Sequence, residues 1–247
     1  MQGFSSMAKF IDLSQRILYE DNHLLVINKL PGEIVQGDKT GDKPLVEIAK
    51  DYIAQKYDKP GNVFLGVVHR LDRPVSGAII LARTSKALER LNAMLQERKI
   101  MKTYWAIVKN KPPKENDTLV NYVWRNKQKN KTIVFDHPIK KSSEASLTYR
   151  IVAQSVNYYL LEIGLHTGRH HQIRAQLAHI GCPIKGDLKY GFPRSNDSAF
   201  IHLHSLKLIL IHPVKNIPLE LIAPPPHDAL WNYFFELFYP DLSHKNL

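Results

Sequence analysis

The 247-residue sequence contains one cysteine, Cys182, which excludes an internal disulfide framework and a cysteine-based zinc cluster. We therefore expect a protein of a reducing compartment, the cytoplasm. The first residues, "MQGFSSMAKFIDLSQRI", lack the apolar core of a signal peptide, and Met1 and Met7 are both candidate translation starts. No apolar run approaches the roughly 20 residues of a membrane span, so we expect no membrane partner.

Several motifs of nucleotide-binding and hydrolytic proteins are also missing. The sequence contains no G-x-x-x-x-G-K-[ST] loop and no G-x-G-x-x-G fingerprint, so we expect no nucleotide cofactor. The absence of G-x-S-x-G disfavours a serine hydrolase. No H-E-x-x-H motif occurs, although two histidine pairs, His166 with His170 and His202 with His204, leave a metal-dependent nuclease as an alternative. We nevertheless expect no functional metal.

Acidic residues are few compared with basic ones. The chain has 34 Lys and Arg against 23 Asp and Glu, which gives a formal net charge of +11. An excess of this size favours a polyanionic partner, and nucleic acid is the commonest. Residues 110–145 are polar and basic with one short apolar run, "TIVF". We expect a surface excursion there, a hairpin that touches RNA with the basic stretch around Arg125 to Lys131.

The hydrophobic pattern predicts an α+β fold. Apolar residues at helical spacing predict helices over 45–57, 85–99, 168–181 and 229–240, with Ser85 as an N-cap. Apolar or alternating runs predict a hairpin over 17–32, strands over 64–70, 77–83 and 102–110, a pair over 144–166, and two strands over 200–213. This order favours a mixed, mostly antiparallel sheet with flanking helices and a central active cleft. We expect an N-terminal extension over 1–15 and one catalytic domain over 16–247.

The stretch "HRLDRPVSG", residues 69–77, separates two apolar runs and places one acid between two arginines. A turn requires Gly, Pro, Asn or Asp, but it does not require this arrangement of charges. Arg70 and Arg73 would keep the carboxylate of Asp72 ionised, below the ordinary aspartate pKa of about 3.9. An ionised carboxylate on a rigidly held loop can act as nucleophile or base. The alternative is an Asp–Arg pair that only closes a turn.

Two further residues are candidates for chemistry. Arg174 lies at the margin of an apolar stripe on the helix predicted over 168–181, where a guanidinium needs an acid or a phosphate as partner. The alternative is an arginine whose stem packs while its charge reaches water. Tyr104, in "KTYWAIV", could place a phenol beside a substrate base, although a tyrosine in a strand more often only packs.

Three separated segments together resemble the RluA-type pseudouridine synthases. "HRLDRPVSGAIILA" is similar to the block H-R-L-D-x-x-T-S-G-L-L-L of that family, and "KTYWAIV" is similar to its K-x-Y-x-A-x-V strand. "LHTGRHHQIRAQLAHIGCPIKGDLKYG" resembles the block that begins T-G-R-x-H-Q-I-R and ends G-D-x-x-Y-G. The resemblance extends over about residues 16 to 232, and the three blocks occur in the order that the family has.

The resemblance implies a role for each matched position. Asp72 corresponds to the catalytic aspartate, and Tyr104 to a tyrosine that stacks near the target uridine and serves as base. Arg174 corresponds to an arginine that pairs with the aspartate. Arg70 resembles the arginine that fills the gap left by a flipped nucleotide. The remaining matched positions that we expect to bind substrate are His69, Arg169 and Gln172.

The implied activity is isomerisation of a specific uridine to pseudouridine in structured ribosomal or transfer RNA, by base flipping and without cofactor or metal. Asp72 could attack the sugar or the base, or abstract a proton. We expect a monomer whose catalytic domain holds RNA without an additional RNA-binding module. The sequence departs from the family pattern at Leu30, Val75 and Gln176, which bears on the choice of substrate. The alternative from another class is a non-catalytic RNA-binding protein on the same fold.

Overall fold

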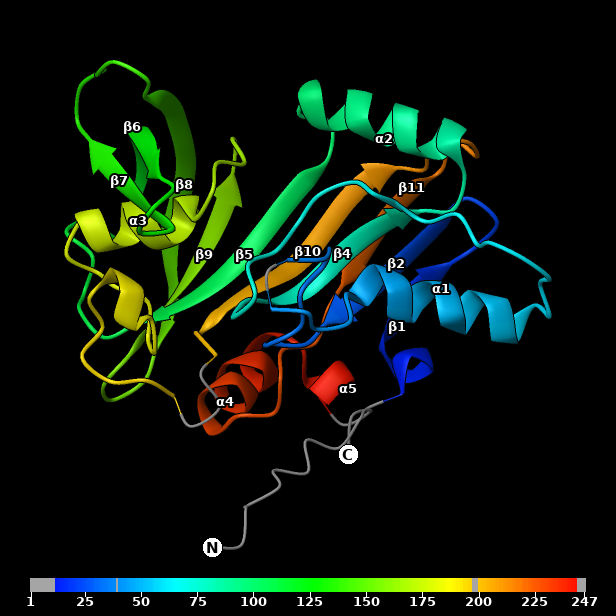
Figure 1. The fold of residues 1–247 in the computed structure, drawn as a ribbon. Helices are drawn as coiled ribbons and strands as arrows, with labels where there is room; N and C mark the ends of the chain where they lie inside the picture. Colours follow the sequence, from blue (N-terminus) through cyan, green and yellow to red (C-terminus); the bar gives the residue numbers. More distant parts are fainter. Residues whose placement is uncertain (1–11, 39, 197–199, 244–247) are drawn as a thin grey trace, which may run out of the picture.

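The fold, a computed structural model, is described for residues 12–38, 40–196 and 200–243. Its strands are β1 Ile17–Glu20, β2 Leu24–Lys29, β3 Gly66–Val67, β4 Ser76–Ala82, β5 Met101–Val108, β6 Asn116–Asn126, β7 Lys131–Phe135, β8 Ser143–Gln154, β9 Tyr159–Leu165, β10 Leu203–Ile211 and β11 Pro218–Ile222. They form one curved sheet in the order β1-β2-β4-β10-β5-β9-β8-β6-β7, while β3 pairs with β4 and β11 with β10 (Figure 1). Strands β4 and β10 are parallel, and the other pairs of the described sheet are antiparallel.

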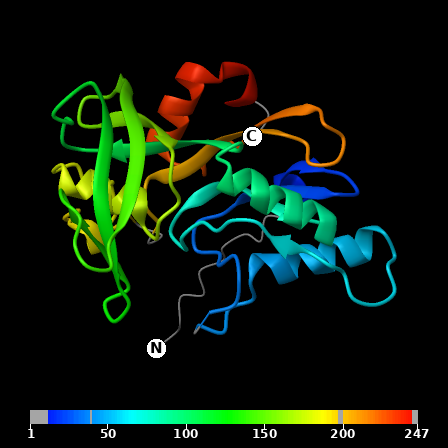
Figure 2. The same ribbon diagram turned by 90° about the horizontal axis from the view of Figure 1, so that it is seen from above.

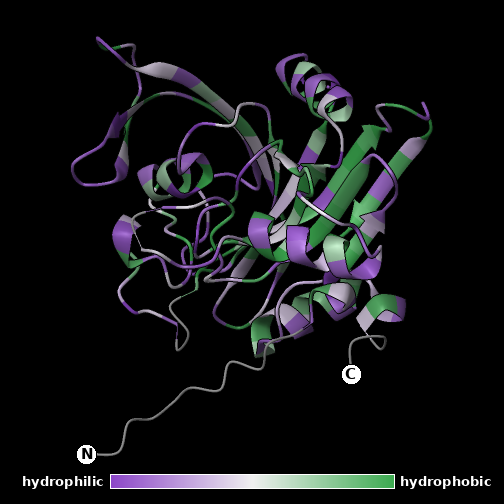
Figure 3. Ribbon diagram, turned by 45° about the vertical axis from the view of Figure 1, so that its right-hand side comes forward, coloured by the Kyte–Doolittle hydropathy of each residue, from purple (hydrophilic) through white to green (hydrophobic). Residues whose placement is uncertain are grey.

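Helices cover both faces of this sheet. They are α1 Leu45–Lys56, α2 Ser85–Gln96, α3 Gln172–His179, α4 Ala229–Phe238 and α5 Pro240–Ser243, and 3-10 turns lie at Leu13–Arg16 and Leu188–Tyr190. Helices α1 and α4 lie on opposite sides of the sheet (Figure 2). Apolar residues concentrate in the central strands, and the outer helical faces are largely polar (Figure 3). This distribution is what burial of one apolar stripe per helix produces.

The α+β fold class and most elements agree with the sequence pattern. The N-terminal hairpin, α1, α2, β5, the β8–β9 pair and α4 lie where the periodicity predicts them. The predicted cap of α2 was wrong by one residue, because the Thr84 hydroxyl oxygen, not Ser85, accepts the Ala87 N–H at 3.1 Å. The described part of the chain contains no helix long and apolar enough to cross a membrane.

The hairpin expected within residues 110–145 is present as β6–β7, but the expectation of a surface excursion was wrong. This segment contains β6, an 11-residue strand that pairs with β8 and β7 inside the main sheet. Leu119, Asn121 and Val123 are buried, while most residues between them remain in contact with solvent. Polar residues alternate with few apolar ones, so the strand signal is weak. The basic stretch forms the tip of the β6–β7 hairpin.

Two other predicted elements also differ. Residues 200–213 give one strand, β10, rather than two, and its second partner is β11 from further along the chain. Helix α3 begins at Gln172 rather than near residue 168, because the N-cap His171 has a left-handed backbone (φ +50°) that ends the preceding turn. The predicted N-terminal extension lies mostly outside the described residues, but Leu13 packs in the core and Arg16 pairs with Glu33 at 2.8 Å.

The close approach of β4 to β10 fixes the strand that follows Asp72. Ser76 and Gly77 pair with His204 and Ser205, and the Ser76 hydroxyl lies 2.8 Å from Nδ1 of His204. Gly77 has φ +116°, and a Cβ at this position would fall on the backbone of Ser205. Only glycine meets both requirements without displacing β10.

We expect Gly77→Ala to lower the free energy of unfolding by more than about 3 kcal/mol, because left-handed strain of about 1–3 kcal/mol adds to displacement of the Ser205 backbone. Gly41→Ala is the matched control, since Gly41 has φ +76° but open space around its Cα. Its loss should be only about 1–2 kcal/mol. Urea unfolding of both variants is the measurement, and equal losses would contradict the close approach.

Candidate active site

Lys29, the last residue of β2, holds the loop that carries Asp72. Its side chain is fully buried, and Nζ donates to the carbonyl oxygens of Leu30 at 3.0 Å, Asp72 at 3.3 Å, Arg73 at 3.2 Å and Val75 at 2.6 Å. Burial lowers the pKa of Lys29 to about 7, against the opposing charges of Glu33 and Asp72. The backbone at Asp72 and just after it is therefore attached to one buried amine.

The Asp72 side chain lies between β3 and β4, is 28% exposed, and uses its two carboxylate oxygens unequally. Oδ2 accepts from Nη1 of Arg174 at 3.0 Å and lies 3.5 Å from Nε2 of His171. Oδ1 has no hydrogen bond to any described residue. One oxygen is thus fixed by the protein, and the other remains available to a substrate.

The predicted cationic neighbours of Asp72 were wrong. Arg73 instead pairs with Asp42, at 2.6 Å, and Arg70 is exposed and forms no ion pair within residues 12–38, 40–196 and 200–243. Arg174 contacts the carboxylate although it lies about a hundred residues further along the chain. The side chains of adjacent residues on a tight turn point in different directions. Adjacency in sequence therefore did not predict which arginine pairs with Asp72.

Arg174 is buried rather than at the margin of its helix, and it connects two acids. Its Nε and Nη2 donate to the two carboxylate oxygens of Asp187, at 2.7 and 2.9 Å, and its guanidinium carbon lies 5.1 Å from the centre of the Tyr190 ring. Burial tends to lower the pKa of Arg174, but the hydrogen bonds and charge of Asp187, together with Asp72, raise it. The remaining nitrogen, Nη1, donates to Asp72.

His171 is a buried, neutral ring between Tyr190 and Asp72. The Tyr190 hydroxyl accepts the backbone N–H of Thr132 at 2.8 Å and lies 3.0 Å from Nδ1 of His171. Burial, with the Arg174 charge, lowers the pKa of His171 to about 2, so the ring carries one proton. We infer that the phenol donates its single proton to Nδ1, because the other nitrogen, Nε2, faces the carboxylate oxygen Oδ2 of Asp72 and a carboxylate only accepts.

Tyr104 lies in the centre of β5 and is almost completely buried. It belongs to the same core cluster as Leu71 and Val75, which flank Asp72 on the loop. Burial raises the pKa of Tyr104 to about 12; a hydrogen bond with Ser205 opposes this shift and the nearby charge of Asp72 adds to it. The structure thus places a protonated phenol near the carboxylate.

Of the four predicted substrate-binding residues, Gln172 and His69 are engaged in hydrogen bonds within the protein, and Arg70 and Arg169 are exposed. Gln172 is buried, and its amide bonds the Thr167 hydroxyl, the Arg169 N–H, the Ser146 carbonyl and the Gln176 amide, so the structure gives it a structural position instead. Nε2 of His69 accepts the Ile80 N–H at 3.1 Å, and burial lowers the pKa of His69 to about 3. Arg70 and Arg169 remain exposed.

Three of the four histidines considered for metal binding contact protein groups through their side chains. His202 lies 2.9 Å from Asp228 and 3.0 Å from Asn196, and His204 bridges Ser76 and the Ala223 carbonyl. Nδ1 of His170 lies 2.9 Å from the Thr132 hydroxyl. Within the described ranges, no three His, Cys, Asp or Glu side chains converge on one point.

A family model described as RNA pseudouridylate synthase matches residues 23–179, a range that includes Asp72, Tyr104 and Arg174. This chain belongs to the RNA pseudouridylate synthase family. The resemblance to RluA-type enzymes that the three sequence blocks indicated is confirmed.

The proteins similar to this chain include two curated bacterial proteins and a human structure. Ribosomal large subunit pseudouridine synthase C of Buchnera aphidicola is 36% identical over 205 residues, which are 81% of this chain and 62% of that protein. tRNA pseudouridine synthase C of Pectobacterium carotovorum is 32% identical, over 87% of this chain and 60% of that protein. This chain thus spans less than two thirds of both. Human RNA Pseudouridylate Synthase Domain Containing 4 has the same fold, with a TM-score of 0.73 at 22% identity over 91% of this chain and 93% of that one.

Sequence reasoning missed four residues that complete this candidate site. They are Lys29, His171, Asp187 and Tyr190. Asp187 and Tyr190 stand in the segment "GDLKYG", where an acid and an aromatic residue between two glycines are a usable signal of a tight, specific turn. Lys29 ends a strand of otherwise buried residues, which is a weaker signal.

We expect Tyr190→Phe to release the tautomer of His171, because Nδ1 loses its only donor. Nitrogen-15 spectra of histidine-labelled protein should show His171 protonated on Nε2 alone from pH 5 to 8 in the wild type, and a mixture of tautomers in the variant. His69 is the internal control, since its Nε2 accepts a backbone N–H and its proton must stay on Nδ1 in both proteins. A wild-type His171 protonated on Nδ1 would refute this assignment.

Proposed function

We propose that this chain converts a specific uridine in structured ribosomal or transfer RNA into pseudouridine. One observation carries the proposal: within a motif of the family, Asp72 has one oxygen fixed by Arg174 and the other unoccupied in a partly exposed position. The net charge of +11 suits an RNA partner. The curated relatives carry names that refer to ribosomal large-subunit RNA and to tRNA.

In this reaction the bond between the sugar and N1 of the base breaks, the base turns over, and a carbon–carbon bond forms. The target base must leave its stack, at a cost of a few kcal/mol. Arg70 is exposed close to Asp72 in sequence and would occupy the vacated position. Oδ1 of Asp72 would attack the sugar or the base, or abstract a proton, while Arg174 and His171 hold Oδ2.

The last step removes a proton from the newly bonded ring carbon, and we assign Tyr104 as the base. Its pKa of about 12 means that the resting enzyme holds a phenol rather than a phenolate. The hydroxyl must therefore lose its own proton before it can take one from the product ring. Residues 16–247 would act as a monomeric catalytic domain in the cytoplasm.

We expect Asp72→Asn to abolish pseudouridine formation while RNA binding stays within threefold of the wild type. The amide keeps the shape of the carboxylate but is neither a nucleophile nor a base. Release of tritium from RNA labelled at uridine C5 measures turnover, and filter binding measures affinity. Asp42→Asn is the control, because Asp42 is a nearby carboxylate that pairs with Arg73. Residual activity of Asp72→Asn within tenfold of the wild type would overturn the catalytic assignment.

We expect Tyr104→Phe to fold, to bind RNA and to lose at least about a hundredfold in single-turnover rate, as is typical for removal of a general base. A base with a pKa of about 12 is ionised in a fraction that rises about tenfold per pH unit below that value. The wild-type rate of the proton-removal step should therefore rise with pH between 7 and 9, and the variant should lose this slope. A variant within threefold of the wild type would leave Tyr104 as a packing residue.

A further inference from the structure

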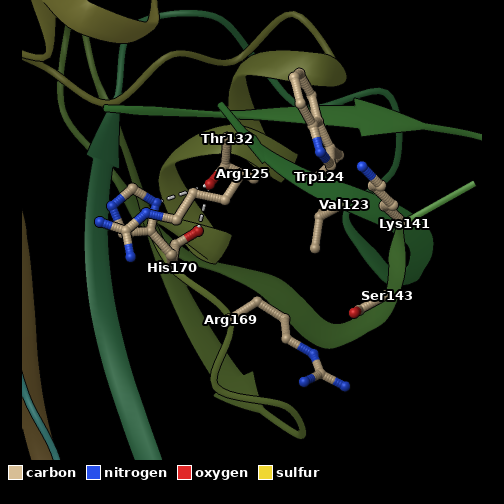
Figure 4. A pocket seen from close by; sticks show the side chains of 8 residues that line it. All are labelled: Val123, Trp124, Arg125, Thr132, Lys141, Ser143, Arg169 and His170. Atoms are coloured by element: carbon tan, nitrogen blue, oxygen red, sulfur yellow. Dashed lines mark hydrogen bonds between the residues drawn. The ribbon is translucent and has the colours of Figure 1, made fainter. Parts of the chain in front are cut away.

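A small pocket lies beside the candidate active site, where the β6–β7 hairpin faces the turn that precedes α3. It has a volume of about 260 Å³, and its polar lining comes from Arg125, Thr132, Lys141, Ser143, Arg169 and His170 (Figure 4). This is below the roughly 300–1,000 Å³ of pockets that enclose drug-sized ligands. The pocket therefore suits a small chemical group of a larger ligand, most of which stays outside the pocket.

The charge of the pocket has one sign. Arg125, Lys141 and Arg169 are exposed cations in its lining, and none of the described lining residues is acidic. Burial and the Arg125 charge lower the pKa of His170 to about 4, so the three permanent cations supply the charge near neutral pH. A cationic pocket with the Ser143 hydroxyl in its lining is suited to an anion.

The donors of these cations are largely unused. Arg169 donates from Nε to the Glu144 carbonyl at 3.0 Å, and its two terminal nitrogens have no hydrogen bond within the described ranges. Arg125 makes one long contact with Asn130, at 3.5 Å, and Lys141 makes no hydrogen bond or ion pair with a described side chain. The backbone at Lys141 is left-handed (φ +70°), an unusual conformation for lysine. Functional sites often retain such strain.

The lining favours a phosphate over a nucleobase. Val123 and Arg125 share one face of β6, and Trp124, which also lines the pocket, carries its ring on the other side of that strand (Figure 4). Two arginine guanidinium groups can instead each present two parallel N–H donors to phosphate oxygens.

The pocket is connected to Asp72 through two adjacent histidines. The rings of His170 and His171 stack with their centres 3.7 Å apart, and Nε2 of His171 lies 3.5 Å from Oδ2 of Asp72. Thr132 links both, since its hydroxyl donates to the His170 carbonyl and its N–H donates to the Tyr190 hydroxyl that holds His171. The distance from pocket to carboxylate is thus of the order of one or two nucleotides.

We propose that this pocket binds a backbone phosphate of the RNA strand next to the nucleotide that enters the site at Asp72. The proposal rests on the proposed function for the identity of that nucleotide. Arg125 holds the phosphate from β6, Lys141 holds it from the turn before β8, and Arg169 holds it from the turn before α3. The pocket thereby sets the register of the strand relative to Asp72.

The test measures binding of a fluorescein-labelled 20-nucleotide RNA hairpin by anisotropy between 50 and 300 mM NaCl. Arg125→Gln and Lys141→Gln should each weaken binding about three- to tenfold at 100 mM salt and reduce the log–log salt slope by up to about 1, as loss of a phosphate contact does. Lys59→Gln is the matched control, because Lys59 is exposed and follows α1 at the opposite end of the molecule (Figure 1). It should change neither quantity.

A double variant, Arg125→Gln with Lys141→Gln, tests whether one phosphate is shared. If it is, the combined loss should be smaller than the product of the single losses. Pocket variants that behave like Lys59→Gln, or multiplicative losses, would overturn the proposal. Turnover is assayed separately: a wild type that forms no pseudouridine, with pocket-dependent binding intact, would refute the proposed function alone.

Discussion

The Arg174 guanidinium is the interaction on which the candidate site depends. A buried charge is tolerated only when it is paired, and Asp187 supplies both oxygens of its carboxylate to two of the three nitrogens. This bidentate contact fixes the plane of the guanidinium, so the third nitrogen can point only toward Asp72. The turn that carries Asp187, helix α3 and the Asp72 loop are consequently held in one arrangement by a single side chain.

The rest of the structure holds Asp72 so that one oxygen remains available. Lys29 anchors the loop backbone, the β4–β10 junction fixes the strand that follows, and Arg174 and His171 occupy Oδ2. Such preorganisation places the cost of orienting a reactive group in folding rather than in the reaction. The β6–β7 hairpin belongs to the same network, because the N–H of Thr132 donates to the Tyr190 hydroxyl. The basic β6–β7 hairpin and the Asp72 carboxylate are therefore connected through one network of hydrogen bonds.

The periodicity of apolar residues was sufficient to predict the helices and strands that bury a continuous apolar face. The sequence pattern predicts helix α2, which places Leu91 in the core, and strand β4, which is buried throughout. It does not predict strand β6, because this strand buries only Leu119, Asn121 and Val123, of which one is polar. The ordered blocks around Asp72, Tyr104 and Arg174 identified the family, since motifs of fixed spacing retain their chemistry without any reference to the fold.

The sequence by itself therefore determined the fold class and the family, and it singled out Asp72 as the candidate catalytic acid. The tertiary structure decided which groups surround that acid. Arg73, next to Asp72 in the chain, pairs elsewhere. Arg174 pairs with Asp72 as the family resemblance implied, whereas His171, which the sequence did not single out, approaches it from the residue before the same helix. It also decided that Gln172 is a structural residue and that Tyr104 is protonated. Side-chain direction, burial and hydrogen-bond partners depend on residues far apart in sequence, and the local pattern carries no record of them.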